Sequence, residues 1–403
     1  MYADDLLILS ETEQGLKDSL NRLSIYNEKW LLKVNYNKSK TMIFHSRVTK
    51  KILNIKLNNQ PLEEVNQFRY LGNIISNTGN FKQNDKYLKL KGQRASYQLM
   101  KLVGRYMKPS NNISLFEKII EPILLYNCEI TTAYIPKKWN FENFIENMWN
   151  TKFEINKVLN NYIRQILGVD KKTSKNGILS ECGKFPLCLK VYVQIVRYWI
   201  RLHTLDNEYM QELLKVELNQ RKNGNDSWLK IVGFLIKYIN CNIDDIQNNN
   251  NTLSLGKFRY EFEKKIKDMY KKSWKENINK SFNESKIEFL CEYKRNFKFE
   301  SYIDNLNFDN RKTVSRFRLS NHNLPIERLR YDNIDREERL CGICDQNLVG
   351  DENHYMIWCQ NYQLRKIREK FLSKVSKIIP EITQLDEKNI IKYCLVLADS
   401  NIH

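Results

Sequence analysis

Four potential metal ligands near the end of the sequence restrict the fold more than any other feature. Cys341 and Cys344 are separated by two residues, His354 follows after nine more, and Cys359 after another four. Three thiolates and one imidazole match the tetrahedral donor set of structural zinc sites and leave no open position for catalysis. A segment of roughly 20–30 residues is too short to build its own core, so zinc would stabilise it. The spacing predicts a structural zinc site, with a chance group of buried cysteines as the alternative.

The charge balance predicts an anionic partner. The chain has 403 residues, with 66 Lys and Arg against 47 acidic residues, which gives a formal net charge of +19. Nucleic acid is the commonest partner for such a surplus, and an anionic membrane surface is the competing one. No stretch approaches the ~18 apolar residues of a membrane-spanning helix, so we expect no membrane partner. The N-terminus has no signal-peptide pattern, so an intracellular protein, in the nucleus or the cytoplasm, is expected.

Helical periodicity dominates from residue 82 to about residue 300. Residues 146–167 have the clearest apolar face, followed by Gly168 as a typical helix C-cap. Residues 188–203 are apolar on nearly all sides, which indicates a buried helix, and residues 257–275 form a basic amphipathic helix.

Two stretches should interrupt this pattern. Pro122 should kink or split the helical stretch 113–127, because proline donates no backbone hydrogen bond. The polar, Asn-rich stretch 220–255 is expected to be a linker or a loop.

The most basic stripe lies between Lys82 and Lys108, where eight Lys or Arg residues accompany a single acidic residue, Asp85. The stripe predicts contact with nucleic acid, and the alternative is a solvated helix face. The apolar face of the same helix is expected to carry Ala95, Leu99, Leu102 and Tyr106. The candidate contact residues are Lys89, Lys91, Arg94, Lys101 and Arg105.

At the opposite end, two adjacent carboxylates, Asp4 and Asp5, precede the strand-like run Leu6–Leu9. A tight turn that presents two carboxylates suits a polymerase site with two divalent cations, since Mg²⁺ prefers hard oxygen ligands. The alternative is an ordinary acidic turn before a strand.

A helix should follow the opening strand, because Ser10–Glu13 reads as a capping box. Its apolar face should carry Leu16, Leu20, Leu23 and Trp30. Further extended segments are expected at Thr41–Phe44, Ile52–Leu57 and Phe68–Ser76, with the last two joined across Asn58-Asn59. The expected fold class is therefore mainly α, with a small α+β part at the N-terminus.

Short motifs, which follow one another in order along almost the whole chain, resemble those of reverse transcriptases of non-LTR (LINE-type) retrotransposons. The matching segments are Tyr2–Asp5, Glu28–Trp30, Val34–Met42, Phe68–Gly72, Glu121–Glu129, Glu181–Leu187, Arg318–His322, Leu324–Glu327 and the Cys-Cys-His-Cys group. The first three resemble motifs C and D of the palm, the fourth resembles the primer-grip strand, and the fifth resembles the thumb.

The resemblance implies roles for individual residues. Asp4 and Asp5 would be magnesium-binding palm carboxylates, and Tyr2 would support their turn. Lys38 or Lys40 would act near the departing pyrophosphate. Tyr70, Leu71 and Gly72 would contact the primer, so the implied partners are RNA and DNA as template and primer.

The resemblance also implies a division of the chain. Residues 1–45 would be a palm remnant, 46–110 the primer-grip hairpin and the start of the thumb, and 111–300 the helical thumb and C-terminal region. Residues 301–370 would form a zinc-knuckle region, and 371–403 a C-terminal tail.

One departure from the family bears on activity. A palm site needs a further Asp from an upstream strand and basic fingers, and the sequence opens at motif C without them. We therefore expect a truncated RNA-directed DNA polymerase that binds template and primer but is inactive alone. The alternatives are a non-catalytic zinc-knuckle protein that binds nucleic acid, or the product of a decayed element.

Overall fold

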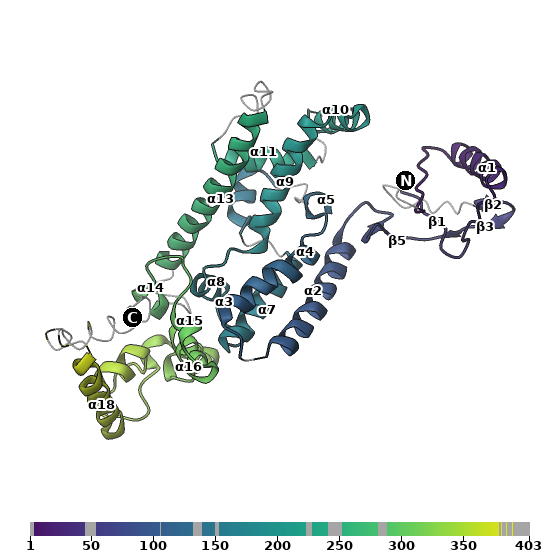
Figure 1. The fold of residues 1–403 in the computed structure, drawn as a ribbon. Coiled ribbons are helices and arrows are strands. Elements are labelled where there is room, and N and C mark those ends of the chain that lie inside the picture. Colours follow the sequence, from purple (N-terminus) through teal and green to yellow (C-terminus); the bar gives the residue numbers. More distant parts are fainter. Residues whose placement is uncertain are drawn as a thin grey trace. The chain divides into compact units, whose positions relative to one another are not determined.

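The structure is a computed structural model that describes residues 4–44, 54–104, 106–131, 139–149, 153–222, 228–240, 252–280 and 288–378, with residues 380, 384 and 389. The chain divides into two compact units, Met1–Leu88 and Lys89–His403. The division falls within one long helix, α2 (Lys82–Val103), and Figure 1 labels the elements along the chain. Helices predominate, and the described strands lie near the N-terminus, as the sequence predicts.

The N-terminal unit packs one helix, α1 (Glu13–Lys29), on short strands. Leu16 and Leu20 of α1 contact a small cluster that includes Ile55, Leu57 and Leu62. The predicted cap is wrong by two residues, because Thr12, not Ser10, accepts a hydrogen bond from the Gly15 N–H. The prediction that Trp30 lies on the apolar face of this helix is also wrong. It follows the last turn of α1 and is 58% exposed.

The strands of this unit form three two-stranded sheets. β1 (Lys40–Thr41) runs parallel to β4 (Glu63–Glu64), and β2 (Lys56–Leu57) runs antiparallel to β3 (Gln60–Pro61). The third sheet pairs β5 (Gln67–Tyr70) with β6 (Asn73–Ser76) in antiparallel register.

Two hairpin turns explain where the strand predictions fail. Asn58 and Asn59 form a turn with φ of 48° and 62°, but it joins β2 to β3 rather than reaching residue 68. Leu71 and Gly72, at φ of 45° and 81°, divide the predicted strand Phe68–Ser76 into a hairpin. Positive φ at both central residues matches the right-handed twist of the flanking strands. The predicted opening strand does not form, since Leu6–Leu9 has no regular secondary structure.

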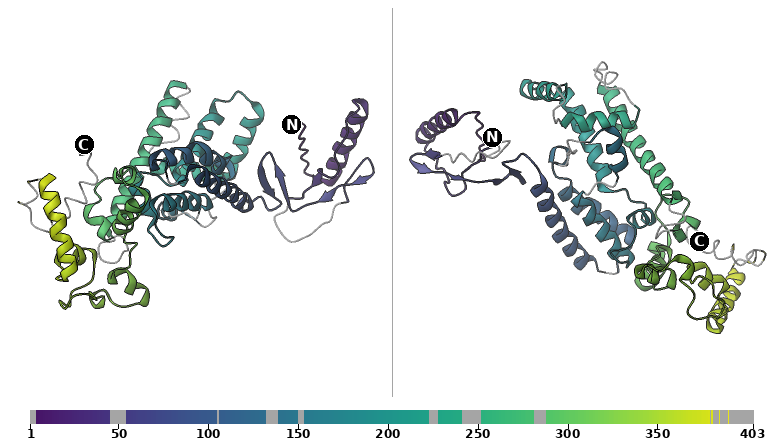
Figure 2. Two further views of the ribbon diagram at one scale, coloured as in Figure 1. Left: turned by 60° about the horizontal axis from the view of Figure 1, so that its bottom comes forward. Right: turned by 180° about the vertical axis from the view of Figure 1, so that it is seen from behind.

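The C-terminal unit is a helical assembly around one continuous apolar core. α9 (Leu187–Thr204) is the predicted buried helix, with Val191 and Ile195 fully buried. It packs beside α13 (Thr252–Lys280), where Arg197 meets Glu263 at 2.6 Å (Figure 1). In the view from behind in Figure 2, α13, in green, runs along the teal helices of this unit. The predicted basic amphipathic helix 257–275 thus lies within α13.

Two sequence expectations need correction here. The helix expected at 146–167 is α7 (Glu154–Leu167), and a separate helix, α6 (Phe141–Asn147), precedes it. Trp149 lies outside both helices, and its partly buried ring packs edge-on against that of Tyr270, with the ring centroids 5.1 Å apart. Gly168 does cap α7 with φ of 68°, as predicted.

The expected linker 220–255 contains a helix, α11 (Trp228–Tyr238). Leu229, Val232 and Leu235 of α11 are buried, so local apolar spacing outweighs the polar average of the stretch. The preceding helix, α10 (Glu208–Lys222), also extends into this stretch.

Pro122 interrupts its helix as predicted. α3 (Pro109–Leu115) passes into a π-helical turn, Phe116–Ile120, before α4 (Glu121–Leu124) begins. Pro122 has no N–H to give to the carbonyl of Lys118, so the regular α ladder cannot continue through this point. The other helices are α5 (Cys128–Thr131), α8 (Lys175–Glu181), α14 (Glu288–Tyr293), α15 (Tyr302–Asn305), α16 (Phe308–Arg318), α17 (Pro325–Arg328) and α18 (Tyr362–Ile378), with 3₁₀ turns at Leu329–Asp332 and Arg336–Glu338.

Four charged side chains form a fully buried ionic cluster within this unit: Glu181, Lys294, Glu300 and Arg318. Arg318 donates to both oxygens of Glu181, through Nε at 2.7 Å and Nη2 at 3.0 Å. Lys294 pairs with Glu300, and the hydroxyl of Tyr302 donates to Glu181 at 2.7 Å. The ionic cluster joins α8 to the end of α16 and so fixes the segment that leads to the cysteines.

None of the described helices combines the length and the apolar character that crossing a lipid bilayer requires.

Candidate metal centre

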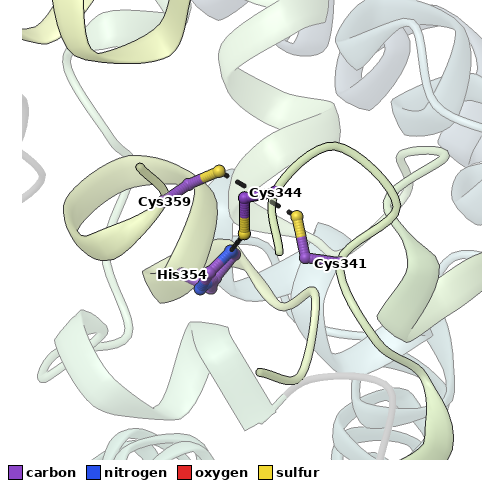
Figure 3. A group of neighbouring side chains, drawn as sticks. All are labelled: Cys341, Cys344, His354 and Cys359. Atoms are coloured by element: carbon purple, nitrogen blue, oxygen red, sulfur yellow. Dashed lines mark hydrogen bonds between the residues drawn. The ribbon is translucent and has the colours of Figure 1, made fainter. Parts of the chain in front are cut away.

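The four predicted ligands converge on one point. The sulfur and nitrogen atoms of Cys341, Cys344, His354 and Cys359, here called the Cys–His cluster, all lie within 4.8 Å of one another. Figure 3 shows the four side chains pointing toward a common centre. The sequence-predicted group is therefore a real cluster that could hold a metal ion.

A short loop presents the first two ligands. The Cys341 N–H donates to the carbonyl of Leu348 at 2.9 Å, and the Gly350 N–H donates to that of Arg339 at 2.8 Å. These bonds fold the Cys-x-x-Cys segment back on itself. Gly350 is needed at this close approach, because a Cβ there would lie 2.9 Å from Pro325 and 3.2 Å from the Cα of Cys341.

A π-helical turn presents the other two ligands. His354 begins the turn His354–Trp358, and the Cys359 N–H donates to the carbonyl of His354 at 2.8 Å. Along an α-helix, five residues would rotate a side chain by about 500°, leaving it roughly 140° away from its partner. The wider π turn reduces this divergence, so the four-residue gap between His354 and Cys359 fits a shared ligand site.

The interatomic distances suit tetrahedral coordination. The Sγ atoms of Cys341 and Cys359 are 3.9 Å apart, and the Cys344 Sγ lies 3.3 Å from Nε2 of His354. Zinc–sulfur bonds of about 2.3 Å and zinc–nitrogen bonds of about 2.0 Å imply ligand separations of roughly 3.5–3.8 Å in a tetrahedron. A zinc-sized ion would thus fit with only small side-chain movements.

Burial sets the protonation of the cluster. Desolvation lowers the pKa of His354, which favours the neutral imidazole that can bind a metal. Desolvation also raises the pKa of Cys359 to about 11. For Cys341, desolvation is outweighed by hydrogen bonds from the Ile343 N–H and the Tyr355 hydroxyl, which lower the pKa of its thiol. The pKa of the Cys341 thiol is therefore lowered and that of Cys359 raised, and Cys359 would release its proton to solvent when a cation binds.

Neighbouring polar contacts hold the cluster in place. Asp351 accepts a hydrogen bond from the His354 N–H at 2.8 Å, and Arg368 of α18 donates to the carbonyl of Cys359 at 2.5 Å. Glu352 accepts from Ser320 at 2.7 Å and contacts Nε2 of His322 at 2.9 Å. His322 is thus a structural hydrogen-bonding residue and lies outside the ligand set.

The carboxylates of the opening motif have a different environment. Asp4 and Asp5 are exposed, and Tyr2 lies outside the described residues. Across the described part of the chain, the Cys–His cluster is the one group of three or more His, Cys, Asp or Glu side chains close enough to share an ion. The structure therefore gives no support to a magnesium site at the Asp pair. Lys38 is exposed, whereas Lys40 pairs with Glu63 at 2.5 Å.

The predicted primer-contact residues lie at the tip of a hairpin. Tyr70 ends β5, and Leu71 and Gly72 make the turn into β6. All three residues are half-buried.

The basic helix α2 presents only some of its predicted contact residues. Arg94 and Lys101 are exposed, as is Lys91, whereas Lys89 forms an ion pair with Glu154 at 2.5 Å. Arg105 lies outside the described residues.

The predicted apolar face of this region is partly wrong, and Tyr97 is a candidate contact residue that the sequence did not suggest. Leu102 and Tyr106, expected on the apolar face, are 85% and fully exposed, while Leu99 is buried. Tyr97 is 72% exposed, three residues after Arg94 and four before Lys101. Its helical spacing from these cations was the signal that could have identified it.

Comparisons with protein-family models, curated protein sequences and solved structures found no match to this chain.

Proposed function

We propose that the chain binds nucleic acid, as a part of a non-LTR retrotransposon reverse transcriptase, and that its Cys–His cluster holds a structural zinc ion. The convergence of the four ligands carries the zinc part of the proposal, because the four side chains predicted from their spacing lie close enough to share one ion. Three thiolates and an imidazole favour zinc over harder cations such as magnesium. The closed ligand set assigns the ion a role in folding rather than in hydrolysis.

The surface of α2 supports nucleic acid as the partner. Arg94, Tyr97 and Lys101 are exposed at positions three and four residues apart, so they lie on one side of the helix. Cations placed beside an exposed aromatic ring suit a strand whose phosphates and bases are both accessible. The formal charge of +19 adds a general attraction for the same partner.

Polymerisation by this chain is not part of the proposal. Asp4 and Asp5 are exposed, and within the described residues no third carboxylate joins them. Two divalent cations need a fuller set of oxygen ligands than two adjacent side chains provide. We expect no Mg²⁺-dependent primer extension by the purified chain.

The test measures zinc content and binding together. The purified chain should contain one zinc ion, and a labelled RNA–DNA template–primer should bind with an affinity that falls steeply as salt rises. Arg94→Gln with Lys101→Gln should weaken binding and reduce the log–log salt slope by about 2, since each lost phosphate contact removes about one unit. Lys215→Gln with Lys271→Gln removes the same charge from exposed positions on α10 and α13 and should change the slope little.

The outcomes separate the alternatives. Binding that ignores salt, or equal effects of the two double variants, would contradict the proposed surface. Template–primer preferred over duplex DNA of equal length favours the reverse-transcriptase assignment, while equal affinity favours a general zinc-dependent nucleic-acid binder. Neither zinc nor binding would indicate the product of a decayed element.

A further inference from the structure

One side of α10 is apolar, exposed and bordered by acidic residues. Tyr209, Leu213 and Val216 are 66%, 43% and 52% exposed, and their spacing of four and three residues puts them on one side of the helix. Leu214, which is buried, faces the core from the other side. The stretch 206–214 contains three acidic residues, all exposed, and no basic one: Asp206, Glu208 and Glu212. Such a surface favours a partner that is both apolar and basic.

α18 has the opposite charge beside its own exposed apolar side chains. Ile367 and Phe371 are four residues apart, and they are 64% and 42% exposed. Lys370 and Lys374, each three residues after one of these two, are exposed and border the same side of the helix. Within Tyr362–Ile378 there are six basic residues and one acidic residue. α18 is therefore complementary to α10 in charge, and both helices offer apolar side chains.

Other occupants of these two surfaces fit less well. A second α10 crossing at Leu213 would bring the Glu212 side chains of both copies together, and two α18 helices would oppose their lysines. Nucleic acid would be repelled by the acidic residues of α10. On α18 it would leave Ile367 and Phe371 against phosphate and sugar. Each helix thus suits the other helix better than it suits its own copy or a nucleic acid strand.

Pairing of α10 with α18 requires two chains. Both helices belong to the C-terminal unit, and they lie at opposite ends of it in Figure 1 and in the view from behind in Figure 2. The α10 of one chain can therefore meet the α18 of another chain, not its own. Because each chain offers both surfaces, the contacts can close into a ring of two or more copies or continue as a filament.

We propose that the exposed apolar side of α10 docks against α18 of a second copy of this chain, with Glu212 beside Lys370 and Lys374. The contact follows from apolar and charge complementarity and does not rest on the proposed function. Arg368 of α18 also holds the carbonyl of Cys359. Association therefore sets α10 of one chain close to the Cys–His cluster of the next.

The contact should be weak and reversible. A single helix pair buries less surface than the roughly 1,200–2,000 Å² of a stable interface, so association should depend on protein concentration. Glu212 contacts Lys215 at 2.7 Å, but the two side chains are 68% and 67% exposed, and such a surface pair is easily exchanged for another. Added salt should weaken the association, because its charges lie at the surface.

Charge reversal on each helix of the full-length, nuclease-treated chain tests the contact. At low salt, sedimentation should show an average mass that rises above that of the monomer as the protein is concentrated. Glu208→Lys with Glu212→Lys should weaken the association by about tenfold or more, because like charges then oppose each other. Lys370→Glu with Lys374→Glu should have the same effect.

The matched control lies on α13. Glu261→Lys with Asp268→Lys changes the charge of exposed positions there by the same amount as the α10 variant and should leave the association unchanged. Circular dichroism should show the same helix content in all of these proteins.

Mixing the α10 and α18 variants gives the sharpest result. Each variant alone opposes like charges, but an equimolar mixture pairs the basic α10 of one protein with the acidic α18 of the other. Association should therefore return in the mixture, which two misfolded variants would not produce. p-Benzoylphenylalanine in place of Tyr209 should also cross-link to a peptide of α18 from a second, isotope-labelled chain.

Four results would overturn the proposal. A wild-type chain that stays monomeric up to its solubility limit would show that the surfaces do not pair. Loss of association in only one of the two charge variants would indicate pairing of like helices, and association that disappears on nuclease treatment would make nucleic acid the occupant. A mixture that stays monomeric would show that α10 and α18 do not meet.

Discussion

The two units of the chain bury their apolar side chains to very different extents. In the N-terminal unit a cluster of four buried side chains, Leu20, Ile55, Leu57 and Leu62, supports the fold, while Leu9 and Leu31 remain 70% and 89% exposed. The C-terminal unit has a continuous core that extends from Leu99 to Leu319. Since burial of apolar surface is the main stabilising contribution to folding, the C-terminal unit should be the more stable one. Its own last segment contains the Cys–His cluster, and we expect the stability of that segment to depend on a bound ion.

The largest expected effect concerns the metal. Cys341→Ser should reduce bound zinc from one ion per chain to almost none, because a serine hydroxyl is a much poorer zinc ligand than the thiolate it replaces in the closed four-ligand set. Hydrogen exchange should then accelerate between residues 340 and 378 but not in α9. Cys291→Ser, at a cysteine outside the cluster, is the matched control and should retain the ion. Unchanged zinc content in the Cys341 variant would refute the ligand assignment.

The buried ionic cluster should produce the next largest effect. Arg318→Met leaves Glu181 and Glu300 with Lys294 as the remaining cation of the ionic cluster, and breaking such a buried pair costs roughly 3–5 kcal/mol. The free energy of unfolding of the C-terminal unit, followed by urea titration, should fall by that amount. Arg365→Met removes a 60% exposed arginine side chain and should cost less than about 1 kcal/mol. Similar losses in both variants would mean that burial of the ionic cluster has no energetic importance.

Matched truncations in the two cores test the comparison directly. Leu235→Ala removes a fully buried side chain from the large core and should cost about 2–5 kcal/mol. Leu20→Ala in the small cluster should cost less, because nearby side chains can shift into the space. Peptide-resolved hydrogen exchange under mild denaturant should show the N-terminal unit opening first. Simultaneous opening of both units would contradict the difference in stability.

A surface ion pair should give the smallest effect, with a defined pH dependence. Hydrogen bonds from Lys157 and Lys89 lower the pKa of Glu154 in the folded protein. A lowered carboxyl pKa stabilises the fold above the unfolded-state value of about 4.3, and that stability is lost as the pH falls through the folded pKa. Glu154→Gln should therefore cost less than about 1 kcal/mol at pH 7 and nothing near pH 2. If the difference in unfolding free energy between the wild type and Glu154→Gln grew as the pH fell, the predicted pH dependence would be wrong.

Structural features that depend on residues close together in the sequence were predicted correctly. The apolar periodicity of α9 and α13, the Gly168 cap and the interruption at Pro122 depend on residues a few positions apart, and each is present in the structure. The Cys–His cluster belongs with them, because ligand spacing restricts the loop that must close around an ion.

Local sequence patterns do not predict contacts between residues far apart in the chain. Glu181 and Arg318 are 137 positions apart, and nothing in either local sequence indicates that they meet in the core. The prediction of the opening strand was wrong for a related reason. Leu6–Leu9 has strand-like composition, but a strand needs a hydrogen-bonding neighbour, and composition does not supply one. The π turn at His354–Trp358 was likewise not predicted, because a search for a periodicity of 3.6 residues detects α-helices and not wider turns.

The buried ionic cluster also restricts how this chain can change over generations. Loss of any one of its four charges leaves an uncompensated charge in the core, whereas replacement of all of them by apolar side chains can be neutral or even stabilising. The intermediate steps are the unstable ones. Descendants of this sequence should therefore keep residues 181, 294, 300 and 318 charged together or lose the charges together, and a related chain with only three of them would need a compensating change nearby.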